Sequence, residues 1–154
     1  IMNFGLWELD EEVAAPARAV RDPAARLRFI IGAHARLVTR GQGAITILVD
    51  EVTALTPAQQ RKITQSKRKY FDFLRDTLNE LKAAGKMQDV DTTAAAFSLL
   101  GMINWLSRWF QQGGALDEEQ AADQIVRIAL HGLLKEQGVR SQKSVVRMAP
   151  PRQG

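Results

Sequence analysis

Residues 91–112 read DTTAAAFSLLGMINWLSRWFQQ, and the pattern of this stretch decides the fold. At about 100° per residue in a helix, its apolar side chains cover roughly 250° of the circumference, against about 100° for an ordinary surface helix. The polar residues Asn104, Ser107 and Arg108 share the remaining side. A membrane span needs about 20 apolar residues, and Asn104 and Arg108 interrupt a shorter run. The stretch therefore predicts a helix that packs against more than one partner, and it argues against a membrane helix.

The following segment, residues 118–137, has a similar excess of apolar residues. Asp117 and Gln120 form its expected capping box, Gly138 closes it, and a Gly-Gly turn joins it to the preceding helix as an antiparallel neighbour. The same hairpin from a second copy would cover the remaining apolar face, in a four-helix bundle about a twofold axis. We therefore predict a homodimer. The alternative is a monomer in which these two helices are simply the central core.

Helical periodicity extends through the rest of the chain, and no convincing strand alternation accompanies it. Pro16 weakens the first helix, and Asp22 and Thr56 are expected N-caps of two later ones. The segment AITILVDEVTAL has the β-branched content of a strand but the apolar spacing of a helix, and we expect a short helix. The fold class is therefore all-α, a bundle of about six helices, over residues 3–19, 23–39, 44–55, 57–85, 91–112 and 118–137.

Length and composition fit one globular domain, because 154 residues with 45% hydrophobic and 25% charged residues can bury a full core. The chain has no cysteine and no signal-peptide pattern at its start, so a cytoplasmic location is expected. The net charge of +4 lies entirely in residues 139–154, which we expect to form a basic, disordered tail. Residues 1–138 therefore have a net charge of zero, which argues against a nucleic-acid surface on the body of the protein.

The residues for catalysis are few. The chain has two histidines, His34 and His131, and lacks cysteine, a G-x-S-x-G motif and a phosphate-binding loop. The acidic residues between Asp117 and Asp123 suit the first turn of a helix better than a metal site. We therefore predict no enzymatic activity, no cofactor and no metal.

Two polar residues on apolar helix faces leave a choice open. His34 and Asn104 could each be a core residue with a satisfied hydrogen bond, or a polar group that orients a ligand in an apolar pocket. The sequence does not separate these two roles.

The stretch DVDTTAAAFSLLGMINWLSRWFQQGGALDEEQAADQIVRIALHGL, residues 89–133, resembles the last two helices of the ligand-binding domain of TetR-family transcriptional regulators. Gly101, Asn104, Trp105, Trp109 and Phe110 occupy its G-M-x-N-W…W-[FY] pattern. Upstream, DPAARLRFIIGAHARLV and LTPAQQRKI…YFDFLRD look like earlier helices of that domain, in the expected order.

The resemblance implies a repressor domain that dimerises through its last two helices and senses a hydrophobic small molecule, such as an acyl-CoA or a related lipid or aromatic compound. Residues 1–20 would be the helix connecting to a DNA-binding head, and residues 21–138 the effector-binding and dimerisation domain. The resemblance implies that DNA is contacted only through a helix-turn-helix head. That head is missing from these 154 residues. The predicted ligand-binding residues are His34, Val38, Leu48, Tyr70, Phe71, Leu74, Phe97, Leu100 and Asn104. The predicted dimer-interface residues are Trp105, Arg108, Trp109, Gln124, Ile128 and His131.

Two other interpretations stay open at this stage. One is a small all-helical enzyme that uses His34 or an acidic pair in the core of the bundle. The other is a dimeric interaction module without a ligand cavity.

Overall fold

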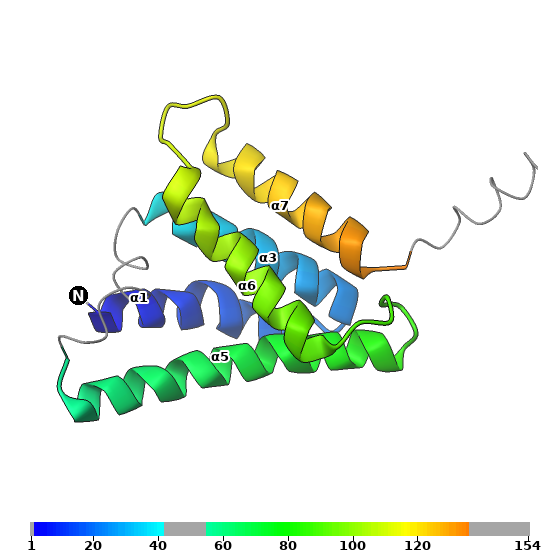
Figure 1. Cartoon of the computed structure of the whole chain (residues 1–154), viewed down its shortest axis with the longest axis horizontal. Coiled ribbons are helices and arrows are strands. Elements are labelled where there is room, and N and C mark those ends of the chain that lie inside the picture. The colour runs from blue at the N-terminus through cyan, green and yellow to red at the C-terminus, as the bar shows by residue number, and fades with distance from the viewer. Residues whose placement is uncertain (1, 42–54, 136–154) are drawn as a thin grey trace, which may run out of the picture.

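All regular structure in the described part of the chain is helical. The computed structural model describes residues 2–41 and 55–135, and these residues contain no strand (Figure 1). The all-α prediction is confirmed. The expected helix over residues 44–55 lies almost wholly outside the described residues, and so does the expected tail. The helices are α1 (Met2–Leu9), η1 (Asp10–Ala14), α2 (Ala15–Arg18), α3 (Pro23–Arg40), α5 (Pro57–Ala83), α6 (Thr92–Trp109) and α7 (Glu118–Leu133).

The capping residues read from the sequence set the helix starts. The Asp22 carboxylate accepts a hydrogen bond from the backbone N–H of Ala25 at 2.8 Å, which fixes the start of α3. Thr56 and Asp117 begin α5 and α7 with complete capping boxes. The α6 helix ends at Trp109, some residues before the expected glycine pair, because Phe110 already has an extended backbone.

The first helix is interrupted where Pro16 was expected to weaken it. Asp10–Ala14 form a π-helical turn, which the backbone N–H of Ala15 closes by donating to the carbonyl oxygen of Asp10. Pro16 has no N–H to donate to an α-helical ladder, and it stands at the start of α2 directly after this wider turn. The segment therefore continues as a helix through the proline, with a change of pitch.

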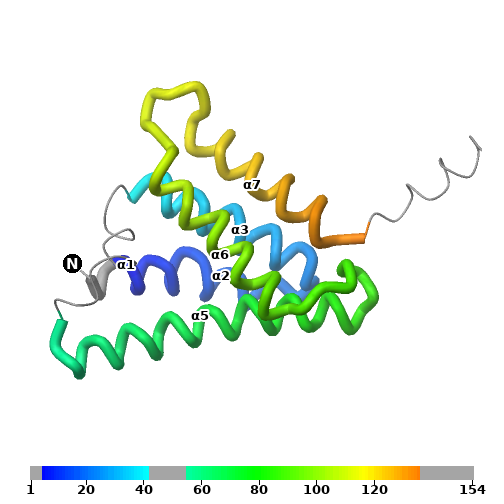
Figure 2. Tube along the Cα trace, viewed as in Figure 1, coloured from blue at the N-terminus to red at the C-terminus, as the bar shows by residue number. Residues whose placement is uncertain are grey.

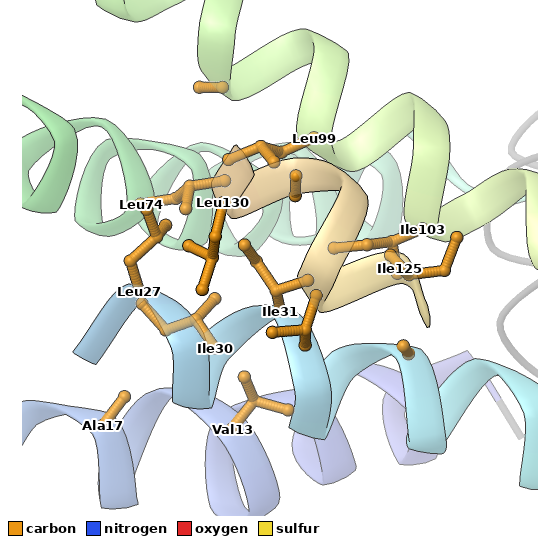
Figure 3. Close-up of a cluster of buried hydrophobic side chains, with 14 of the residues drawn as sticks. Val13, Ala17, Leu27, Ile30, Ile31, Leu74, Leu99, Ile103, Ile125 and Leu130 are labelled. Carbon is orange, nitrogen blue, oxygen red and sulfur yellow. The ribbon is translucent and has the colours of Figure 1, made fainter. Parts of the chain in front are cut away.

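Helix α3 is the centre of the bundle, and it packs against α5, α6 and α7 (Figure 1). The tube view in Figure 2 shows α5 along one edge and α7 along the opposite edge. Leu27, Ile30 and Ile31 of α3 are fully buried, and Figure 3 shows side chains from the other helices packed around them. This core is contiguous from η1 to α7, so the described helices form one packed unit.

No helix among the described residues combines the length and the apolar content that crossing a bilayer would require.

Candidate functional site

A buried polar pair joins α3 and α5. Nδ1 of His34 and Oη of Tyr70 lie 3.0 Å apart and share a hydrogen bond, and the two rings meet edge to face. Burial lowers the pKa of His34 to about 4 and raises the pKa of Tyr70. Both groups are therefore neutral near pH 7, so the phenol can donate to the imidazole. His34 thus has the satisfied hydrogen bond of a core histidine.

A groove of about 710 Å³ lies beside this pair, between the first helical segment and the N-terminal half of α5. Figure 2 shows α1 running alongside that half of α5. Tyr70 stands on the wall of the groove, while His34 lies behind it. The described lining residues are Leu6, Trp7, Leu9, Asp10, Ala14, Arg18, Lys62, Ile63, Ser66, Lys69 and Tyr70.

The groove carries more positive than negative charge. Among its described lining residues, Arg18, Lys62 and Lys69 are cationic and Asp10 is the single acid. Arg18 reaches Asp10 at 3.4 Å, and its guanidinium also lies 5.2 Å from the ring centroid of Phe73. The acid of the groove is therefore already paired, which leaves the two lysines to set the charge at its rim.

The predicted ligand-binding residues are distributed over several places. Tyr70 lines the groove and contacts His34, while Val38 and Leu74 are buried in the core. Phe71 contacts Phe97 at 4.6 Å between ring centroids, and Phe97 is 63% exposed on α6. Leu100 and Asn104 of α6 are partly buried, and Leu48 lies outside the described residues.

Sequence reasoning missed the cationic lining of the groove. A signal was present, because the segment from Pro57 to Tyr70 contains Arg61, Lys62, Lys67, Arg68 and Lys69 and no acid. From sequence alone, such a run on a helix followed by acids is typical of a solvated face. Only the fold shows that two of its lysines lie next to the first helix.

The six predicted interface residues on α6 and α7 are all exposed. Trp105 is 64% exposed and Ile128 60%, and Trp109, Arg108, Gln124 and His131 are also exposed. Phe97 belongs to the same surface, because Phe97, Gly101 and Trp105 follow one another at four-residue spacing on one helix face. We call this surface the α6–α7 face.

Two exposed glycines lie in these two helices, Gly101 in the middle of α6 and Gly132 in the last turn of α7. A Cβ added to Gly101 in α6 or to Gly132 in α7 would meet no atom within 4 Å. Glycine destabilises a helix by roughly 1 kcal/mol relative to alanine. Packing within the described residues thus offers no reason for a glycine at either position.

Metal-binding side chains do not converge in the described residues, where no group of three His, Asp or Glu residues could hold an ion.

Comparison with known proteins identifies the type of domain. Residues 20–133 match the family described as "Tetracyclin repressor-like, C-terminal domain". The crystal structure of AibR in complex with isovaleryl coenzyme A and operator DNA is 35% identical over 82% of this chain and 69% of AibR, with a TM-score of 0.76. A TetR/AcrR-family regulator from Thermobifida fusca YX-ER1 is 30% identical over 86% of this chain and 70% of its own, with a TM-score of 0.77.

The ketosteroid regulator KstR2 of Mycobacterium tuberculosis shares the fold, with a TM-score of 0.81 at 21% identity, over 88% of this chain and 70% of its own. Comparison with curated protein sequences gives no match. The fold and the matched region define a helical regulator domain of the tetracycline-repressor type. The chain belongs to the TetR family of transcriptional regulators.

Proposed function

We propose that this chain is the effector-binding and dimerisation domain of a TetR-family repressor, without enzymatic activity. Residues 1–20 act as the connecting helix and residues 21–138 bind the effector and the second copy. The effector is a hydrophobic small molecule such as an acyl-CoA or a related lipid or aromatic compound. The observation that carries the proposal is the exposed apolar α6–α7 face.

The α6–α7 face is too apolar to be an ordinary surface. Trp105 and Trp109 lie on α6 and Ile128 on α7, and all three are exposed, although each helix already buries a separate face in the core. Large exposed apolar patches on soluble proteins mark interaction sites. A second copy of the same hairpin would supply a matching surface about a twofold axis.

The effector class is supported by the likeness to AibR and by the presence of a cavity. AibR was crystallised with isovaleryl coenzyme A, and this chain is 35% identical to it. The groove of about 710 Å³ is within the size range of small-molecule sites, which is roughly 300–1,000 Å³. An effector would shift the dimer between two arrangements by its difference in affinity for them, and by no more than that difference.

Sedimentation equilibrium of the purified chain tests the dimer. We expect twice the mass of the chain at micromolar concentration. A monomer at that concentration would contradict the proposal. Calorimetric titration with isovaleryl-CoA, against free coenzyme A as control, tests the effector class: acyl-dependent binding supports it, and equal binding of both contradicts it.

A further inference from the structure

We infer that the groove between the first helical segment and α5 binds a ligand with an apolar body and an anionic headgroup, and that Lys62, Lys69 and Arg18 hold the headgroup. This inference rests on the proposed function, since it assigns a place and a chemical class to the effector. Of the predicted ligand-binding residues, Tyr70 belongs to the lining of this groove and His34 lies behind it.

The walls of the groove suit an apolar body. Leu6 and Leu9 of α1 face Ile63 and the ring of Tyr70 on α5, and Trp7 adds a 57% exposed indole. Apolar walls with a few polar groups are typical of small-molecule sites. Since the Tyr70 hydroxyl is bonded to His34, this wall presents mainly an aromatic ring to a ligand.

The polar part of the groove favours an anion. Lys62 and Lys69 are seven residues apart on α5, so they lie on the same helix face about 10 Å apart along the axis. Both are exposed, and no described residue forms an ion pair with either of them. A carboxylate or phosphate would give each lysine a charged partner close to the apolar walls.

Arg18 completes the cationic side and is already placed by two contacts. Its pair with Asp10 is long, at 3.4 Å, and both side chains are about half exposed. The contact with the Phe73 ring holds the guanidinium beside the groove. A ligand anion can therefore share Arg18 with Asp10 or replace Asp10 as its partner.

The charge around the groove extends beyond its lining. The α5 segment from Pro57 to Tyr70 holds five cations and no acid, so the field is positive on the α5 side of the groove, whereas the first helical segment carries acids at residues 8 and 10–12. An anionic ligand is attracted by this field, whereas a neutral ligand of the same length gains nothing from it.

Titration of the whole chain with three ligands of equal chain length tests the inference: octanoyl-CoA, octanoate and octanol. We expect the two anions to bind at least about tenfold more tightly than octanol, because hydrogen bonds from a lysine or arginine to an anion are stronger than those to a neutral hydroxyl. The difference between octanoyl-CoA and octanoate tells whether the groove prefers phosphates or a carboxylate.

A matched pair of variants locates the headgroup. The double variant Lys62→Gln/Lys69→Gln should weaken anion binding by about tenfold or more and leave octanol binding unchanged. The control Arg61→Gln/Arg68→Gln removes the same charge at the same spacing from α5 residues outside the groove lining. We expect the control to change anion binding by less than about threefold, as a screened long-range effect.

Several results would overturn the inference. Equal losses in the two double variants would show that general charge, and not the groove, attracts the anion. If octanol bound as tightly as octanoate, the groove would have no preference for an anionic headgroup. If none of the three ligands bound, the groove would not be a ligand site. The dimer measurement of the proposed function is independent of all these results, so the two can fail separately.

Discussion

Two tryptophans of this molecule are almost equally exposed, and their surroundings differ completely. Trp7 on α1 is 57% exposed and lines a hollow with cations at its rim. Trp105 on α6 is 64% exposed and belongs to an apolar stripe with Phe97, and Ile128 is likewise exposed on α7. Exposure of an aromatic side chain therefore does not assign its role. The shape and charge around the side chain distinguish the proposed ligand groove from the proposed dimer face.

The largest expected effect comes from placing a charge on the α6–α7 face. Trp105→Glu should raise the dimer dissociation constant by about thousandfold, because a twofold axis introduces the change twice and buried tryptophans each contribute 2 kcal/mol or more. Sedimentation equilibrium measures the shift, and circular dichroism should show an unchanged helical fold, since Trp105 is exposed in the protomer.

Trp7→Glu is the matched control for this substitution, because it puts the same charge in place of a similarly exposed indole on the other side of the comparison. We expect it to leave the dimer intact. If both variants dissociated the dimer equally, the α6–α7 face would lose its special role.

The two regions were not equally predictable. The excess of apolar residues on α6 and α7 is a property of single helices, so periodicity alone indicates which residues, such as Trp105 and Ile128, the protomer leaves exposed. The helix caps are local as well, and Thr56 and Asp117 were correctly placed. The groove joins Arg18 to Lys69, which are far apart in the chain, and no local pattern links them.

The same distinction explains the outcome for His34. Its apolar helix face indicated burial, and it is buried, but its partner Tyr70 is 36 residues away. Only tertiary packing decides whether such a histidine contacts a side chain or a ligand. The two roles were therefore left open by the sequence.

The next largest effect concerns pH on the groove side. Burial lowers the pKa of His34 to about 4 in the fold, from an ordinary value of 6.5 when unfolded. As the pH falls from 6.5 to 4, the unfolded chain binds the proton first, so the free energy of unfolding should decrease by about 3 kcal/mol through this group. Above pH 6.5 this group adds no pH dependence.

Urea unfolding across that pH range measures the loss, and His34→Gln isolates it. Glutamine can still accept a hydrogen bond from the Tyr70 hydroxyl, but it does not titrate. The variant should lose less stability between pH 6.5 and 4 than the wild-type chain. An identical pH dependence in both would mean that the carboxylates alone cause it.

The smallest expected effect is that of replacing Gly101 with alanine. The substitution should stabilise the protomer but weaken the dimer, so it tests whether Gly101 lies in the dimer contact. In the protomer a Cβ on Gly101 meets no atom within 4 Å, so Gly101→Ala should stabilise α6 by about 1 kcal/mol through helix propensity. If Gly101 lets a partner helix approach closely, the same methyl groups should weaken the dimer by about tenfold. Unfolding under dissociating conditions measures the first effect and sedimentation equilibrium the second.

Gly132→Ala on α7 should likewise stabilise the protomer and weaken the dimer. A stabilised protomer with an equally tight dimer would place both glycines outside the contact and restrict the interface to the tryptophans and Ile128.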